Sequence, residues 1–340
     1  MHTVPDILSH SMRTVRISFP VILVISLGVG LSSCRPAGQD SAQVSSNLGD
    51  SNNSTAETLR AEGIAALESK KYDEALRKFT LASEQGDAQS QYKLGLIYDK
   101  GEGVTKNNTL ALEWFRKAAE QKYAKAEFRI GLAYANGQVY AKDEAAAVDW
   151  YGRAAEKGLP EAQYNLGWMF ENGKGVAKNE DTAVAWFLKA AEQNYAIAQC
   201  GIGLAYANGQ VVPKDEAIAV AWYRKGAEQK YAEAQYCLGL MYDKGRGVPK
   251  DEAKAVEWYL KAAEQDLAIA QFNLAFKYLL GYGIPKDETT AAQWFRRAAE
   301  QGHTDSQFML GCLYAEGKGV PKINFLAYKW ATLAKEGGVA

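Results

Sequence analysis

Residues 232–265 read AEAQYCLGLMYDKGRGVPKDEAKAVEWYLKAAEQ, and near-copies of this stretch recur along most of the chain. Tryptophan marks the copies at intervals of 36 residues, and we number the repeats one to seven by it: Trp114, Trp150, Trp186, Trp222, Trp258, Trp294 and Trp330. Small residues recur with the same period: Gly95, Gly131, Gly167, Gly203, Gly239, Ala275 and Gly311. Seven in-phase copies predict an array of stacked units that each bury surface against their neighbours.

Each copy contains two segments with helical spacing of apolar residues. Ser90, Leu94 and Tyr98 lie four residues apart in the first segment, and Ala111 and Phe115 do so in the second. The stretch GRGVPKD at 245–251 lies between such segments, so we expect glycine to end the first helix and the aspartate to cap the second. The fold class is therefore all-α, an α/α solenoid of antiparallel helix pairs. We expect the tryptophans to anchor it, since burying about 200 Å² contributes roughly 5 kcal/mol.

A shorter unit precedes the seven repeats. Gly63, Ala75 and Phe79 match the pattern, but Gly63 and Ala75 are separated by 12 residues where Gly95 and Ala111 are separated by 16. This unit therefore lacks four residues of the connection between its helices. We expect one tetratricopeptide-like unit at 56–86, followed by seven 36-residue repeats at 87–338.

The repeat pattern resembles a known family. The motif A-x-A-Q-Y-x-L-G-x-x-Y-x-x-G-x-G-V-x-K-D, followed by A-V-x-W-Y-x-K-A-A-E-Q, is similar to the Sel-1-like repeat and is nearly complete at 232–265. The resemblance implies a superhelix of the tetratricopeptide type whose first helices line a concave face. It also implies an adaptor that binds a protein or peptide partner and catalyses no reaction.

The N-terminal residues resemble an export signal. Residues 17–31 read ISFPVILVISLGVGL, an apolar run that follows Arg13 and Arg16. The run ends in Leu31-Ser32-Ser33-Cys34, which resembles a bacterial lipobox. We expect a signal peptide at 1–33, for which a start at Met12 would give a compact 22 residues, then a lipidated Cys34 and a flexible linker at 34–55. The resemblance implies a lipoprotein in the bacterial envelope, anchored to the membrane by its acyl chains.

The residue after the cysteine bears on localisation. Arg35 lacks the aspartate that commonly retains lipoproteins in the inner membrane. We therefore expect delivery to the outer membrane, facing the periplasm, in a cell that has one.

Composition argues against several function classes. The chain has 39 Lys and Arg against 40 Asp and Glu, so a nucleic-acid partner is not expected. Three histidines and glycine-rich loops without a following G-K-[ST] indicate no metal and no nucleotide cofactor. Glutamates such as Glu120 recur three residues after a lysine or arginine, and we interpret them as surface ion pairs rather than paired catalytic carboxylates.

A second function remains open. Ser90-Gln91-Tyr92-Lys93 matches the S-x-x-K signature of penicillin-recognising enzymes, and a cysteine-rich branch of the family has been assigned such roles. The alternative is therefore a penicillin-recognising or peptidoglycan-related envelope protein. Ser90 occupies a position held by alanine in other repeats, and neither K-T-G nor S-D-N follows.

The cysteines differ from that branch, which carries a pair eight residues apart in each repeat. Cys200, Cys237 and Cys312 have no such spacing. Cys200 and Cys237 fall on neighbouring first helices, which leaves two alternatives open, a bridge between them or two buried free thiols.

Two sets of residues are candidates for partner contact. The first is an aromatic row on the expected concave face, for which core packing is the alternative: Tyr92, Phe128, Tyr164, Tyr236, Phe272 and Phe308. The second is a patch in repeat six, where Leu279 and Leu280 replace mostly polar residues and local repacking is the alternative: Ile269, Phe276, Leu279, Leu280 and Tyr282. We interpret His303 as a packing substitute at a joint between repeats. No polar cap follows the second helix of repeat seven, so we also expect self-association at that end.

Overall fold

The computed structural model describes residues 55–209 and 211–338, so Cys34 and the rest of residues 1–54 lie outside the described part of the chain. Within these ranges the chain forms sixteen α-helices and no strand. The described residues fall into two compact units, 55–143 and 144–338. The prediction of an all-α fold is confirmed.

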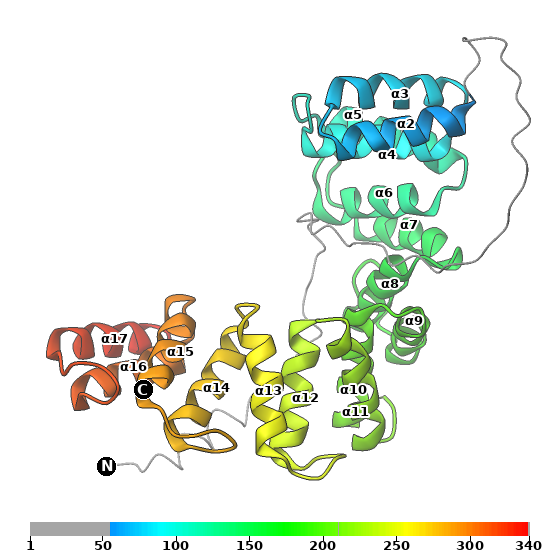
Figure 1. The fold of residues 1–340 in the computed structure, drawn as a ribbon. Helices are drawn as coiled ribbons and strands as arrows, with labels where there is room; N and C mark the ends of the chain where they lie inside the picture. Colours follow the sequence, from blue (N-terminus) through cyan, green and yellow to red (C-terminus); the bar gives the residue numbers. More distant parts are fainter. Residues whose placement is uncertain (1–54, 210, 339–340) are drawn as a thin grey trace, which may run out of the picture. The chain divides into compact units, whose positions relative to one another are not determined.

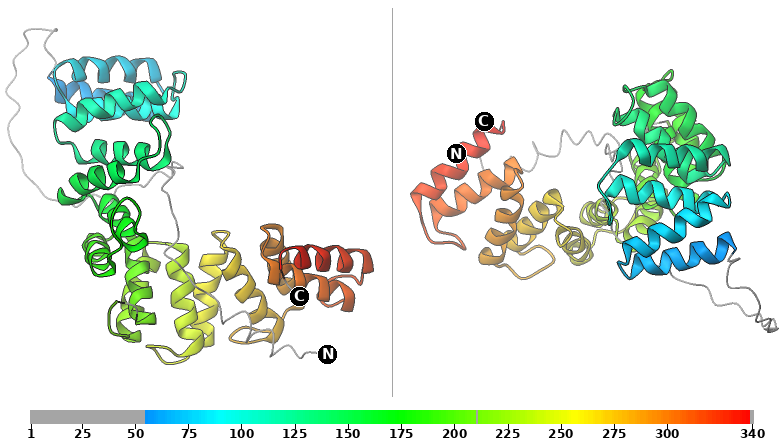
Figure 2. Two further views of the ribbon diagram at one scale, coloured as in Figure 1. Left: turned by 180° about the vertical axis from the view of Figure 1, so that it is seen from behind. Right: turned by 90° about the horizontal axis from the view of Figure 1, so that it is seen from above.

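Both units are stacks in which each helix packs against the next one in sequence (Figures 1 and 2). The first unit holds α2 (Ala56–Glu68), α3 (Tyr72–Glu84), α4 (Ala88–Lys100), α5 (Asn108–Glu120) and α6 (Ala124–Asn136). The second holds α7 (Glu144–Glu156), α8 (Pro160–Asn172), α9 (Glu180–Glu192), α10 (Ala196–Asn208), α11 (Glu216–Glu228), α12 (Ala232–Lys244), α13 (Glu252–Ala263), α14 (Ala268–Leu280), α15 (Glu288–Glu300), α16 (Thr304–Glu316) and α17 (Asn324–Glu336). From α4 onward, even numbers are first helices and odd numbers are second helices.

The connections between paired helices follow the sequence pattern. Residues 69–71 join α2 to α3, whereas residues 101–107 join α4 to α5, so the first unit of the array lacks four loop residues as predicted. In repeat five Gly245 ends α12 in the left-handed region at φ +65°. Gly247 lies so close to the preceding repeat that a Cβ there would overlap the Glu216 carbonyl. This glycine therefore lets the loop rest on the second helix of the repeat before it.

Aspartate or asparagine caps most second helices. Asp251 accepts a hydrogen bond from the Lys254 backbone N–H at 2.9 Å. Equivalent caps, with acceptor-to-nitrogen distances of 2.9–3.0 Å, are made by Asn107, Asn179, Asp215 and Asp287. The predicted capping role is confirmed at these positions, and each cap satisfies an N–H that has no partner within the helix.

In repeats one to six the buried anchor is the residue after the tryptophan, whereas repeat seven has the exposed Ala331 at that position. Phe115, Phe187, Tyr223, Tyr259 and Phe295 are all buried, whereas every tryptophan of the array is only half-buried. The glycine row explains this arrangement, because a Cβ on Gly239 would lie 2.8 Å from the Tyr259 ring. The expectation that tryptophan anchors the core was wrong by one position, since the adjacent ring is the one that meets the first helix.

The tryptophans instead carry a cation on their outer face. Lys225 Nζ lies 4.0 Å from the centre of the Trp222 ring, and the same contact recurs at Trp114, Trp150, Trp186, Trp258 and Trp294 with distances of 3.9–4.7 Å. The ion pair expected between Lys117 and Glu120 does not form in the described chain, because the lysine lies over the ring. Such contacts contribute about 0.5–1 kcal/mol each at exposed sites.

Buried glutamines connect the repeats within each unit. Gln235 donates from Nε2 to the Ala227 carbonyl of the preceding repeat at 3.2 Å, and its Oε1 accepts from Gln265 of its own repeat at 2.7 Å. The same two bonds are made by Gln91, Gln163, Gln199 and Gln271. We call these residues the glutamine spine. Because an unsatisfied buried amide costs about 1–3 kcal/mol, the spine fixes the spacing of successive helix pairs.

Candidate functional site

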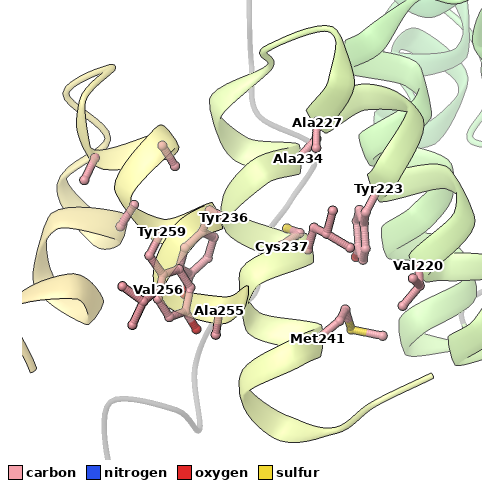
Figure 3. Packing of buried hydrophobic residues seen from close by; sticks show 14 of the residues in the cluster. Val220, Tyr223, Ala227, Ala234, Tyr236, Cys237, Met241, Ala255, Val256 and Tyr259 are labelled. Atoms are coloured by element: carbon pink, nitrogen blue, oxygen red, sulfur yellow. The ribbon is translucent and has the colours of Figure 1, made fainter. Parts of the chain in front are cut away.

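The aromatic row lies mostly in the core. Phe128, Tyr164, Tyr236 and Phe272 are buried, while Tyr92 and Phe308 are half-buried. Tyr236 packs on Tyr259 with ring centres 5.8 Å apart, on the α13 side of α12 (Figure 3). Tyr164 packs on Phe187 at 5.3 Å and Phe272 on Phe295 at 5.8 Å, so these rings also fill the space between the two helices of their pairs. Their burial favours the alternative of core packing for this part of the row.

Phe276, one of the five candidate residues in repeat six, is also a core residue. Its ring meets Phe272 edge-on at 4.9 Å and Phe295 edge-on at 5.1 Å. These three rings form the centre of the packing between α14 and α15. The preceding residue, Ala275, replaces the glycine that the other repeats have at this position. The core of repeat six therefore differs from the others at both Ala275 and Phe276. The Phe276 side chain is only 6% exposed, which favours the alternative of local repacking for this residue.

The remaining patch residues lie at the surface of α14 and of the loop that follows it. Ile269, Leu279 and Leu280 are half-buried against the same aromatic cluster. Tyr282 is 52% exposed, one of the most exposed large apolar side chains in the described residues. Repeat five carries Asp243, Lys244 and Arg246 at the places of the last three. We use the name repeat-six patch below for the accessible part: Leu279, Leu280 and Tyr282.

A buried lysine lies next to this patch and was missed by the sequence analysis. Lys277 is only 7% exposed and forms an ion pair with Asp243 on α12 of the preceding repeat. Its Nζ also lies 5.8 Å from the centre of the Tyr282 ring. The sequence does carry a signal, because the same position holds apolar residues in other repeats, among them Met169 and Met241. A charged residue at a position that is apolar in all other repeats indicates that the contact between repeats five and six differs from the other contacts between repeats.

Ser90 does not have the environment of a nucleophile. Its side chain is 0% exposed, and its Oγ is buried without a hydrogen-bond partner. Burial lowers the pKa of Lys93, with Lys125 and Lys100 adding to the effect, but that amine is only half-buried. A substrate would have no route to the Ser90 hydroxyl in this structure, because the side chain fills the alanine position of the repeat.

His303 packs at a joint between repeats, as expected, and it also caps the helix that follows. It precedes α16, and its Nδ1 accepts from the Ser306 backbone N–H at 3.2 Å. Its ring packs on Phe272 with centres 4.9 Å apart. Burial lowers the pKa of His303, which matches an unprotonated Nδ1 acting as the cap acceptor.

The thiols of the two neighbouring first helices meet. Cys200 on α10 and Cys237 on α12 are both free thiols, and Cys200 packs against the core cluster that contains Cys237. Cys237 is buried and Cys200 is half-buried. The interaction with Cys237 and burial raise the pKa of the Cys200 thiol.

One cavity of about 280 Å³ lies in the first unit, between α4, α5 and α6. Its lining includes Asp99 and Arg129, which form an ion pair at 3.7 Å, together with Lys106 and Asn136. No three His, Cys, Asp or Glu side chains gather as a metal site among the residues that the structure describes. In the same residues no helix is long and apolar enough to span a membrane, since none exceeds 13 residues.

Comparison with known proteins identifies the repeats. The Sel1 repeat model matches seven consecutive segments: 88–123, 124–159, 160–195, 196–231, 232–267, 268–303 and 304–339. Together these matches span well over half of the chain. A search of curated proteins found no match.

Two solved structures are similar along most of the chain. A Sel1 repeat protein from Oxalobacter formigenes is 32% identical with a TM-score of 0.65, and the match covers 84% of each chain. A protective antigen present in uropathogenic Escherichia coli strains, which displays an SLR fold, is 37% identical with a TM-score of 0.62. That match covers 78% of this chain and 64% of the antigen chain. The repeat model and these similarities agree with the stacked helix pairs and the recurring glycine, tryptophan and glutamine rows, and the chain belongs to the Sel1 repeat family.

Proposed function

We propose that this protein is a lipid-anchored scaffold of the bacterial envelope that binds an apolar segment of a protein partner through the repeat-six patch. The observation that carries the proposal is the replacement of three charged residues of repeat five by Leu279, Leu280 and Tyr282. Accessible apolar side chains at places where the preceding repeat is charged favour contact with another molecule.

The chemistry of the patch indicates the kind of segment that it would bind. Lys277 is paired with Asp243 and is buried, so it adds little net charge at the surface. Tyr282 offers a large ring with a polar edge, which is typical of interface residues. An uncharged, apolar peptide segment fits this surface better than an acidic or a basic one.

The direct test is a double substitution, Leu279→Asp with Leu280→Lys, which introduces the residues of repeat five. The wild-type protein and the double variant would each be purified from envelopes with their bound partners. The partners are then identified and quantified by mass spectrometry. We expect recovery of the specific partner to fall about tenfold or more, the effect of losing an anchor worth above 1.4 kcal/mol. Unchanged recovery would contradict the proposal.

The array offers a matched control for this test. Ala135→Asp with Asn136→Lys introduces the same residues at the same positions of repeat two. This variant should keep the partner at the wild-type level. Thermal melting of both variants separates lost contact from lost folding, and early melting of the repeat-six variant alone would mean that the leucines are core residues.

The lipid anchor at Cys34 is a separate part of the proposal. It is supported by the lipobox-like residues 31–34 and the apolar run before them. Mass spectrometry of the purified N-terminus should find an acylated Cys34 as the first residue, and fractionation should place it in the outer membrane where the cell has one. An unmodified Cys34 still joined to Ser33 would contradict anchoring.

The penicillin-recognising alternative has less support. Its candidate nucleophile, Ser90, is buried in the alanine position of the repeat. Nitrocefin turnover by the wild-type protein that disappears with Ser90→Ala would establish it.

We also propose that a second copy packs on the outward face of α17. Phe325 and Tyr328 are 74% and 73% exposed there, whereas Val220 and Val256, which are equivalent to Tyr328, are buried by the next helix pair. The outward face of α2 is not a complementary partner, because Glu62 stands where other repeats carry a buried leucine or isoleucine. We therefore expect contact between two α17 faces.

Light scattering at two concentrations tests this contact. It should show a dimer that the double substitution Phe325→Thr with Tyr328→Lys abolishes. A monomer at both concentrations would contradict the proposed dimer.

A further inference from the structure

Two cysteines replace the usual residues at two different positions of the repeat. The position of Cys200 holds an aromatic residue in every other repeat: Tyr92, Phe128, Tyr164, Tyr236, Phe272 and Phe308. The position of Cys237 varies among the other repeats: Lys93, Arg129, Asn165, Gly201, Asn273 and Met309. Each substitution occurs once, and the two fall in consecutive repeats.

These two positions face one another across the joint between neighbouring repeats. At the next joint along the chain, Tyr236 and Asn273 occupy the positions equivalent to Cys200 and Cys237, and their side chains interact. At the joint between repeats four and five, Cys200 packs against the core cluster that contains Cys237. The paired cysteines therefore occupy the one joint in the described array where both facing residues are thiols.

The backbones are also close at this joint. Four small residues of α10 are buried, which lets neighbouring helices approach it on more than one side: Gly201, Gly203, Ala205 and Ala207. In the second unit, α10 and α12 approach one another more closely than any other two first helices of neighbouring repeats. A disulfide needs Cα atoms about 4.4–6.8 Å apart, so close approach of the two helices is the main geometric requirement.

We propose that Cys200 and Cys237 are joined by a disulfide in the exported protein, linking α10 of repeat four to α12 of repeat five. In this step the two thiols lose two protons and two electrons, and one sulfur–sulfur bond forms. The electrons reduce a disulfide donor of the thiol–disulfide exchange class, which leaves as two thiols. The proposal rests on delivery to the envelope, because the cytosol keeps such thiols reduced.

The surroundings of the thiols favour a permanent link over a switch. Cys237, Tyr223 and Met241 belong to the core cluster that surrounds α12 (Figure 3). The interaction with Cys237 and burial raise the pKa of Cys200, so the thiolate that exchange requires is scarce in the folded protein. A bond made during folding would accordingly resist reduction and hold the two first helices together while α11 opens locally.

The experiment uses the full-length protein purified from envelopes without reductant. It is unfolded in denaturant with N-ethylmaleimide, digested with trypsin and analysed by mass spectrometry. We expect one cross-linked species that contains Cys200 and Cys237, two hydrogen masses below the sum of its peptides, with neither cysteine alkylated. Cys312 is the internal control and should be fully alkylated. Alkylation of all three cysteines in the envelope protein would overturn the proposal for the exported state.

A second measurement distinguishes two requirements of the proposal: that the two thiols are placed to form a disulfide, and that the protein reaches an oxidising compartment. The full chain is refolded with a mixture of reduced and oxidised glutathione and analysed in the same way. A bridge formed here but absent from the envelope sample would refute delivery to an oxidising compartment and leave the geometry intact. No bridge in either sample would refute the geometry, whatever the N-terminal acylation of Cys34 shows.

Variants test what the link does. Reductant should lower the urea midpoint of the bridged wild-type protein and leave Cys200→Ser and Cys237→Ser unchanged. Equal responses of the wild-type protein and both variants would contradict a structural link.

Discussion

Repeats five and six share one framework and differ on one surface. Both have the spine glutamine, the capping aspartate and the buried ring after the tryptophan, namely Gln235, Asp251 and Tyr259 in repeat five and Gln271, Asp287 and Phe295 in repeat six. They differ along the C-terminal half of the first helix and in the loop after it. The residues of repeat five and their equivalents in repeat six are Gly239 and Ala275, Met241 and Lys277, Asp243 and Leu279, Lys244 and Leu280, and Arg246 and Tyr282. The glutamine, cap and ring positions are therefore fixed by packing. Positions at this end of the first helix can change without loss of the array, including that of Lys277, which joins repeat six to Asp243 of repeat five.

The largest effect should come from removing the buried ring of either repeat. Tyr259→Ala and Phe295→Ala should each lower the free energy of unfolding by about 3–5 kcal/mol, because each leaves a cavity against the first helix. Urea denaturation measures the loss. Trp258→Ala is the matched control, and we expect a cost of about 1–2 kcal/mol because that ring is only half-buried. Equal costs at Trp258 and Tyr259 would restore the tryptophan as the anchor.

The next effect concerns the ion pair that only repeat six contributes. Lys277→Met introduces the residue of repeat five and leaves the nearly buried Asp243 with only the more exposed Lys244, at 3.5 Å, as its ion-pair partner. We expect the free energy of unfolding to fall by roughly 3 kcal/mol or less. Adding Asp243→Leu should recover most of this loss, since the buried charge that has lost its closer partner is then gone. A double variant as unstable as the single one would mean that Lys277 acts through packing alone.

A smaller effect is expected where a glycine of repeat five becomes an alanine in repeat six. Gly239→Ala places a Cβ 2.8 Å from the Tyr259 ring, so overpacking should exceed the gain in helix propensity. We expect a net loss of about 1–2 kcal/mol in thermal or urea unfolding. Ala275→Gly should cost about 1 kcal/mol, from helix propensity only. A Gly239→Ala variant more stable than the wild-type protein would show that the ring can move aside.

The smallest effect is a dependence on pH at the end of repeat six, where His303 replaces Leu267 of repeat five. Burial lowers the pKa of His303 below its ordinary value near 6.5, and Asp305 opposes this shift. The unfolded chain therefore binds the proton first, and stability should decline as the pH falls below about 6.5. His303→Leu should remove this component of the decline. Melting temperatures between pH 5 and 8 would reveal it, and parallel profiles for both proteins would contradict the assignment.

Most of the framework could be predicted from the sequence because it depends on periodic positions. The helix pairs, the loop glycines and the capping by Asp251 follow from spacing and local chemistry, and the structure confirms them. The buried ring was also open to this reasoning, because Ala255 and Tyr259 lie four residues apart on one helix face, as Ala111 and Phe115 do, whereas Trp258 is off that face. The size of the tryptophan ring outweighed this spacing in the prediction, and the close approach of Gly239 to Tyr259 shows that spacing was the better guide.

The candidate site was less predictable, because it depends on how deep each side chain lies. Phe276 and Leu279 share the apolar character that marked the patch, yet the first is enclosed by Phe272 and Phe295 and the second faces the surface. Lys277 was missed because its partner, Asp243, lies 34 residues earlier on another helix. Reading each column across all seven repeats would have singled out this lysine, since Met169 and Met241 stand in its place.

The central claim, that repeat six contacts a partner where its sister repeats do not, is tested most directly by photocrosslinking. A photoreactive phenylalanine derivative replaces Tyr282 in one protein and Lys174, the equivalent residue of repeat three, in another. Both proteins are irradiated in intact envelopes. The account predicts one partner crosslinked through position 282 that is absent at position 174 and lost when Leu279→Asp with Leu280→Lys is added. The same crosslinks at both positions, or none at 282 in a folded protein, would contradict it.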